Sequence, residues 1–123
     1  MTSDKQIFIA EDNTDMQEIY RTIFVDLTDS IHLVKDGIEA IKYLSANTPN
    51  LMILDINMPG MSGLEVLRHI KQEDRFSDVK TIIVTSNAPA MNSEISSLAD
   101  LFVTKPVDVF HLKILAERLL SQA

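Results

Sequence analysis

The stretch Leu51-Met52-Ile53-Leu54-Asp55 decides the fold. Four consecutive apolar residues end at a carboxylate, and such continuous apolarity is typical of a strand buried on both faces, as in a parallel sheet. Four further short runs, mostly β-branched or aliphatic, have the same character, at residues 6–10, 31–34, 81–84 and 101–103. The sequence therefore predicts five buried strands.

Helical periodicity lies between these runs. After the first run, apolar residues recur with the spacing of one helical face, at Met16, Ile19, Tyr20, Ile23, Phe24 and Leu27. Asp36 and Ser62 each precede a glutamate by three positions, a pattern that caps helices, and they predict helices over residues 38–45 and 64–72.

Two more helices are expected in the second half of the chain. Asp108 predicts the cap of a last helix that turns Leu112, Leu115 and Leu119 inward. Residues 91–99 predict a short or irregular fourth helix, because the serines and asparagines of this region are poor residues for a helix interior.

This alternation predicts one α/β domain over residues 1–123. The expected architecture is a doubly wound, five-stranded parallel sheet flanked by five helices, a (βα)5 flavodoxin-like three-layer sandwich. In such sheets, functional side chains gather beyond the carboxyl ends of the strands, near the switch in strand order.

Composition excludes several classes of protein. With 18 acidic against 11 basic residues, the net charge of −7 argues against sequence-independent nucleic-acid binding. Apolar stretches of at most four residues predict neither a membrane-spanning helix nor a secretory signal. The absence of cysteine excludes a disulfide scaffold and cysteine-bound zinc, so we expect a cytoplasmic protein.

Polar residues follow four of the expected strands. They are Glu11 and Asp12 after the first strand, Asp55 after the third, Thr85 after the fourth and Lys105 with Pro106 after the fifth. Carboxylates that converge at one edge repel each other unless a cation neutralises them, and oxygen ligands alone favour Mg²⁺. A simpler reading remains open, in which Asp12 or Asp15 merely caps the following helix.

Five fragments in this order resemble the receiver domain of bacterial two-component response regulators, in its single-domain, chemotaxis-regulator-like form. Four of them carry the strand ends and the fifth opens the second helix. They are Ile9-Ala10-Glu11-Asp12-Asn13, Asp36-Gly37-Ile38-Glu39-Ala40, Leu54-Asp55-Ile56-Asn57-Met58-Pro59-Gly60-Met61-Ser62-Gly63, Ile83-Val84-Thr85-Ser86 and Val103-Thr104-Lys105-Pro106. The resemblance covers essentially the whole chain.

The resemblance implies a role for each residue at the strand ends. Asp55 would accept a phosphoryl group from a phosphohistidine on a histidine kinase or histidine phosphotransfer protein. Mg²⁺ would be held by Asp12, Asp55 and the backbone carbonyl of Asn57, and through water by Glu11. Lys105 would pair with Asp55 and then with the phosphoryl group, to which Thr85 would donate a hydrogen bond. The Lys105–Pro106 bond would be cis, and the domain would assist its own phosphorylation and dephosphorylation without being a turnover enzyme.

The switch and its output are less well defined. Phe102 stands where the family places an aromatic relay residue that turns inward together with Thr85; the alternative is a static apolar residue at the sheet edge. Thr85 and Lys105 are 20 residues apart, a shorter spacing than the family usually shows, and Leu98-Ala99 replaces its Gly-Ala pair. The downstream protein therefore stays unknown.

Surplus apolar residues mark the last helix. Val109, Phe110 and Ile114 exceed what one buried face requires, so we expect either a partner surface, with phosphorylation-dependent self-association, or a wider buried stripe. The histidines, which are His32, His69 and His111, have no ligand spacing and predict no metal site.

The leading hypothesis is a phosphorylatable signalling switch. No output domain is expected after residue 123, so the chain is read as a stand-alone regulator or as a domain of a larger protein. An aspartyl phosphatase is disfavoured because Asn57 stands where an Asp-x-Asp pair has its second acid. A receiver-like interaction module that acts without phosphorylation is the remaining alternative.

Overall fold

Five parallel strands form one sheet in the order β2-β1-β3-β4-β5. The computed structural model describes residues 3–86 and 97–122. The strands are β1 (Ser3–Ala10), β2 (Thr28–Val34), β3 (Leu51–Asp55), β4 (Lys80–Thr85) and β5 (Leu101–Thr104). The five predicted strands and the doubly wound order are thus confirmed, with β1 and β2 starting three residues earlier than predicted.

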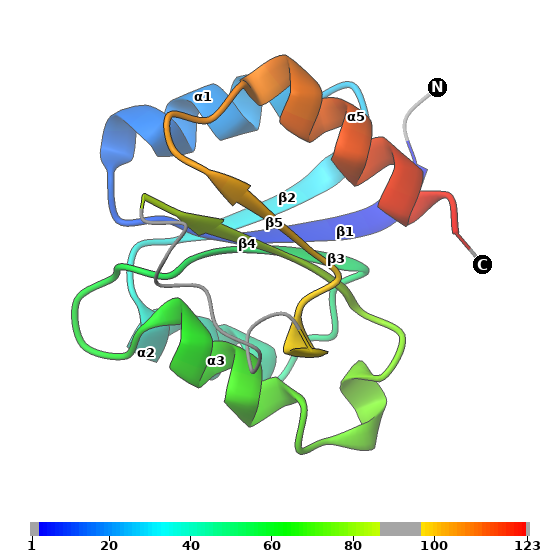
Figure 1. Ribbon diagram of the computed structural model, residues 1–123. Helices are drawn as coiled ribbons and strands as arrows, with labels where there is room; N and C mark the ends of the chain where they lie inside the picture. The colour runs from blue at the N-terminus through cyan, green and yellow to red at the C-terminus, as the bar shows by residue number, and fades with distance from the viewer. Residues whose placement is uncertain (1–2, 87–96, 123) are drawn as a thin grey trace.

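Helices cover both faces of the sheet (Figure 1). One face carries α1 (Thr14–Phe24) and α5 (Val109–Leu120), and the other carries α2 (Gly37–Leu44) and α3 (Gly63–Ile70). A short 3-10 helix, η1 (Asp74–Phe76), which the sequence did not predict, precedes β4. The result is the predicted three-layer sandwich.

Successive side chains of the central strands point to opposite faces of the sheet, so the core has two parts. On β1, Ile7 and Ile9 pack with α1 and α5, whereas Phe8 and Ala10 pack with α2 and α3. Every residue of β3 is buried, as the continuous apolar run predicted. Among residues 3–86 and 97–122, no helix is both long and apolar enough to span a membrane.

Capping side chains fix the starts of the helices. Asp36 accepts a hydrogen bond from the Glu39 amide at 2.8 Å, and Ser62 forms a reciprocal capping box with Glu65. Asp108 accepts from the amides of the second and third residues that follow it. These caps are the predicted ones, and α2 and α3 begin one residue before the predicted start.

The number of helices differs from the prediction. The part of the chain that the structure describes holds four α-helices and one 3-10 helix rather than five α-helices. The fourth helix predicted over residues 91–99 lies mostly outside the described residues. At the end of that segment, Leu98 and Ala99 pack against the core on the side of α2 and α3.

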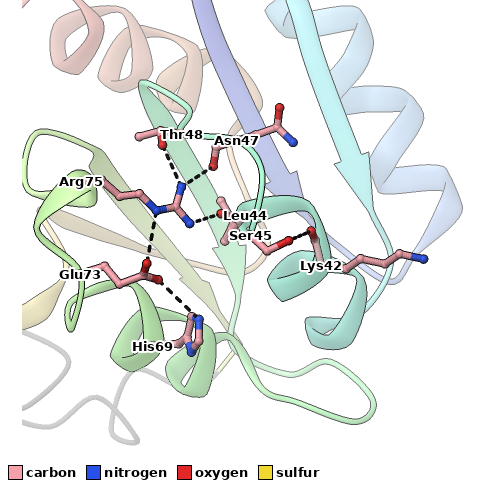
Figure 2. Close-up of polar contacts among 8 residues, drawn as sticks. All are labelled: Lys42, Leu44, Ser45, Asn47, Thr48, His69, Glu73 and Arg75. Atoms are coloured by element: carbon pink, nitrogen blue, oxygen red, sulfur yellow. Dashed lines mark hydrogen bonds and ion pairs between the residues drawn. The ribbon is translucent and has the colours of Figure 1, made fainter.

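Arg75 links the connection between α3 and β4 to the connection between α2 and β3, near the amino ends of these strands (Figure 2). Its guanidinium donates to the Leu44 carbonyl at the end of α2 and to Thr48 Oγ1 at 3.0 Å, and it lies 4.0 Å above the Phe76 ring. Glu73 accepts from Arg75 Nε at 3.3 Å and lies 3.7 Å from His69. This network fixes the edge of the sheet opposite the carboxylates that follow β1 and end β3.

Candidate functional site

Three carboxylates meet at the carboxyl ends of β1 and β3. Glu11 and Asp12 follow β1, Asp55 ends β3, and one oxygen from each lies within 4.8 Å of the others. In the sheet, β1 lies between β2 on one side and β3 on the other, so the strand order reverses direction at β1. The cluster therefore lies at the switch point of the sheet. Glu11 and Asp55 are only 1% and 2% exposed, while Asp12 is exposed.

Lys105 and Asn57 hold the two oxygens of Asp55. Lys105 Nζ lies 2.8 Å from Oδ2, and the backbone amide of Asn57 donates to Oδ1 at 3.0 Å. The long lysine side chain reaches across from the end of β5, beyond β4. The buried carboxylate is therefore paired with an ammonium group and held in one orientation.

The capping alternative can now be decided. The side chain that caps α1 is that of Asn13, which accepts from the Met16 amide at 2.9 Å. Neither Asp12 nor Asp15 is the N-cap, and the exposed Asp12 side chain belongs to the carboxylate cluster. A residue that the sequence reading did not consider, Asn13, thus performs the structural role and leaves Asp12 available as a ligand.

The cluster carries more negative charge than its protein partners offset. Burial, and to a smaller extent the Asp55 charge, raise the pKa of Glu11 to about 7, although the hydrogen bond from the Asn13 amide and the Lys105 charge act to lower it. Glu11 Oε1 is buried and has no hydrogen-bond partner among the described residues. A divalent cation would satisfy this oxygen and relieve the repulsion, so the donor set fits Mg²⁺.

Lys105 stays charged in this environment. Burial works to lower its pKa, but the hydrogen bond to Asp55 and the charges of Asp55, Glu11 and Asp12 outweigh that effect and raise the pKa. The ammonium is therefore a permanent positive charge beside the buried carboxylate.

A model of the response regulator receiver domain family matches residues 7–117. The chain belongs to this family. The match confirms the resemblance drawn from the five fragments.

Related proteins agree with the assignment. The chain is 39% identical over 83 residues to the Regulator of RpoS of Escherichia coli K12, and the match covers 68% of this chain but only 25% of that protein. The receiver domain thus spans about a quarter of the length of the first curated relatives it matches. It is 27% identical to the polar-differentiation response regulator DivK of Brucella anthropi, over 85% of this chain and 87% of DivK.

Solved structures share the fold. A CheY-like receiver domain from Methylobacillus flagellatus superposes with a TM-score of 0.84 at 22% identity, over 95% of this chain and 99% of that one. The response regulator TrrA of Thermotoga maritima, solved in complex with Mg²⁺-BeF, gives a TM-score of 0.82 at 30% identity, over 94% and 98%.

The remaining predicted residues of this receiver domain lie on β4, on β5 and directly after β5. Thr85 ends β4, is 1% exposed, and its carbonyl accepts from the Lys105 amide at 2.7 Å. The Lys105–Pro106 peptide bond is cis, as the resemblance implied. Phe102, on β5, is 49% exposed, so its ring points outward here.

Glycine lets α3 start directly against the backbone of Asp55. A Cβ atom at Gly63 would lie 2.4 Å from the backbone oxygen of Asp55. Gly60, in the same connection, has a φ of 75°, a conformation that L side chains rarely adopt. These two glycines of the fragment that follows β3 are therefore required by the backbone path around Asp55.

Two residues of α1 lie beside the cluster, although the sequence predicts no role for Gln17 and only a core position for Tyr20. Gln17 Nε2 donates to the Glu11 carbonyl at 2.6 Å and to the Val34 carbonyl at 3.3 Å. Tyr20 is buried, and burial, followed by the charges of Glu11 and Asp55, raises its pKa. Gln17 stands between apolar positions of the helix, where nothing in the pattern distinguishes it from a solvent-facing polar residue.

Proposed function

We propose that this receiver domain accepts a phosphoryl group on Asp55 from a phosphohistidine of a kinase or phosphotransfer protein, in a Mg²⁺-dependent reaction. The observation that carries the proposal is the state of the Asp55 carboxylate. It is buried, its two oxygens are held by Lys105 and the Asn57 amide, and two further carboxylates lie beside it.

The transfer requires one bond to form and one to break. An Asp55 oxygen attacks phosphorus, the phosphorus–nitrogen bond of the donor breaks, and its electron pair returns to the imidazole nitrogen. A carboxylate nucleophile has no proton to lose, so the step needs no general base. The Asn57 amide orients it, and Lys105 offsets the charge that collects on the phosphoryl oxygens.

Mg²⁺ would be bound by Asp12, Asp55 and the Asn57 backbone carbonyl, and through water by Glu11. Bound there, the cation would offset the negative charge of the phosphoryl group, which the three carboxylates would otherwise repel. The unpartnered Glu11 oxygen and the crowding of the three acids support this assignment.

The aspartyl phosphate would change a protein-binding surface through Thr85 and Lys105. Charge-assisted hydrogen bonds are worth roughly 1.5–3 kcal/mol each, and a nearly complete two-state shift takes about 5.5 kcal/mol. Two such bonds therefore suffice for a large but incomplete shift. The proposed response is that Thr85 moves toward the phosphoryl group and Phe102 turns inward, held by packing because phenylalanine has no hydroxyl.

Exposed apolar side chains of β5 and α5 are the proposed output surface. Phe102, Phe110 and Ile114 are 49%, 71% and 50% exposed, in line with the surplus of apolar residues that the sequence places on the last helix. Exposed aromatic and aliphatic side chains suit a protein partner, and a second copy of this chain is the partner we propose to test.

Binding of beryllofluoride, a phosphoryl mimic, tests the proposed function. We expect fluorine NMR to show a bound beryllofluoride signal for the wild type with Mg²⁺, and none for Asp55→Asn or after chelation of the cation. A bound signal of equal intensity in Asp55→Asn would overturn the assignment and favour an interaction module that acts without phosphorylation.

A further inference from the structure

Gln17 closes a ring of hydrogen bonds around the acids that follow β1. Its side-chain amide donates to the Glu11 carbonyl at 2.6 Å and to the Val34 carbonyl at 3.3 Å. Val34 ends β2, and its carbonyl also accepts from the Glu11 amide at 3.0 Å. One side chain of α1 therefore bridges the carboxyl ends of two neighbouring strands.

The same ring includes the start of α1. The Gln17 backbone amide donates to the Asn13 carbonyl at 3.0 Å, and the Asn13 amide donates to Glu11 Oε2 at 3.1 Å. The Glu11 carbonyl that Gln17 holds belongs to the peptide unit that joins Glu11 to Asp12. Fixing this unit restricts the direction in which the exposed Asp12 side chain leaves the backbone, while Glu11 Oε1 stays without a partner among the described residues.

We propose that Gln17 is a positioning residue of the acceptor site, which holds the Glu11–Asp12 peptide so that both carboxylates face a divalent cation beside Asp55. This inference rests on the proposed function, because the cation is the one that phosphoryl transfer would use. Gln17 itself touches neither the cation nor the phosphoryl group. Its contribution is preorganisation, since a ligand already held in place loses less conformational freedom on binding.

Two substitutions separate positioning from charge. Gln17→Met keeps the length of the side chain and removes both donors. Gln17→Glu also removes the donors but adds a negative charge near the cluster, which by charge alone would tighten Mg²⁺ binding. Positioning predicts weaker binding in Gln17→Met, which adds no charge, and the difference between the two variants then measures the effect of charge.

Thr22→Val is the matched control. Thr22 Oγ1 donates to the Glu18 carbonyl at 2.9 Å, so this variant also removes a side-chain-to-carbonyl hydrogen bond from α1, away from the acids. Urea unfolding without divalent cation checks that all variants fold.

Calorimetric titration with Mg²⁺ alone is the measurement. We expect Gln17→Met to raise the Mg²⁺ Kd about five-fold, the size of one lost hydrogen bond, with Thr22→Val at the wild-type value. With acetyl phosphate as donor, half-maximal phosphorylation of Gln17→Met needs more Mg²⁺, while its rate at saturating Mg²⁺ stays within about two-fold of wild type. A wild-type Kd in Gln17→Met would overturn the inference.

Amide hydrogen exchange keeps this inference separable from the proposed function. In Gln17→Met we expect faster exchange at the Glu11 and Asn13 amides, and unchanged exchange there in Thr22→Val. If the wild type binds no Mg²⁺, the proposed function fails while the exchange rates still report whether Gln17 holds this segment. Unchanged exchange at both amides contradicts the positioning role in either case.

Discussion

Glu11 is a buried acid whose charged form is disfavoured both by burial and by the neighbouring carboxylates. Its side chain is buried next to Asp12 and Asp55, and burial is the largest cause of a pKa raised from 4.5 to about 7. A raised folded-state pKa means that the folded protein favours the protonated acid more than the unfolded chain does.

Stability without divalent cation should therefore depend on pH in a predictable direction. Between pH 4.5 and about 7 the unfolded chain releases the Glu11 proton while the folded protein keeps it, so the contribution of this group is complete below pH 4.5 and is lost as the pH rises toward 7. We expect urea unfolding of Glu11→Gln to show a smaller fall in unfolding free energy across this range than the wild type. Identical slopes for the two proteins would contradict the account.

Lys105 is the counterpart of the three acids. Replacing it by methionine keeps most of its packing but leaves the buried Asp55 carboxylate with the Asn57 amide as its remaining hydrogen-bond donor among the residues that the structure describes. We expect Lys105→Met to lose about 1–3 kcal/mol of unfolding free energy at pH 7, the usual cost of a buried polar group that loses its partner. Lys113→Met, which removes the exposed bridge to Asp26, is the control and should cost less than about 1 kcal/mol. Equal losses in chemical denaturation would count against a special role for Lys105.

At this scale the sequence predicts the reactive groups better than the groups that support them. Glu11, Asp12, Asp55 and Lys105 are found together because strand ends of a parallel sheet share one edge. Supporting contacts such as those of Gln17 depend on distances between a helix side chain and carbonyls of two strands, which no spacing along the chain encodes.

Among the elements, α3 starts against the backbone of Asp55. Gly63 begins this helix, and its amide donates to the Ile56 carbonyl at 3.2 Å. Because a methyl group there would meet the Asp55 backbone oxygen at 2.4 Å, either β3 or α3 has to shift.

Gly63→Ala should therefore destabilise the domain by about 1–3 kcal/mol, as overpacking typically does. Thermal or urea unfolding measures the loss. Ser62→Ala, which removes the cap but not the close approach, gives the scale of an ordinary capping loss of about 1 kcal/mol. An unchanged unfolding free energy in Gly63→Ala would show that α3 and β3 have room for the added methyl group.

The outer face of α5 should behave differently. Phe110 is 71% exposed and Ile114 is 50% exposed, so neither contributes much to the core. We expect Phe110→Ser to change the unfolding free energy by less than about 0.5 kcal/mol, whereas Leu112→Ser, at 1% exposure, unfolds far more easily. Comparable destabilisation by the two substitutions in urea would mean that the outer face is packed rather than available.

Elements were predictable where one signal dominated. Continuous apolar runs gave the strands, and the side chains of Asp36, Ser62 and Asp108 gave the helix starts. The 3-10 helix η1 was missed because it is held by contacts such as the hydrogen bond from the Arg75 guanidinium to the Leu44 carbonyl, which joins distant parts of the chain.

Over the whole molecule, charge and apolar surface are unevenly distributed. Residues 1–61 carry 10 acids and 4 bases, and three of those acids form the cluster at the switch point. From residue 81 onward there are 4 acids and 3 bases, together with the exposed Phe102, Phe110 and Ile114. The proposed input site is therefore acidic, while the proposed output surface is nearly neutral and partly apolar.

Sedimentation of the whole protein tests that division. We expect beryllofluoride with Mg²⁺ to increase the sedimentation coefficient of the wild type through self-association, and the double variant Phe110→Ser/Ile114→Ser to stay monomeric under the same conditions. A wild type that remains strictly monomeric with and without the mimic would remove self-association from the account and leave a different protein as the partner.

The most direct measurement of the central claim is the intact mass of the protein after incubation with acetyl phosphate. The account predicts that the wild type gains one phosphoryl group in the presence of Mg²⁺ and none after chelation, and that Asp55→Asn gains none in either condition. An unmodified wild type, or equal modification of wild type and Asp55→Asn, would contradict the claim that Asp55 is a Mg²⁺-dependent phosphoryl acceptor.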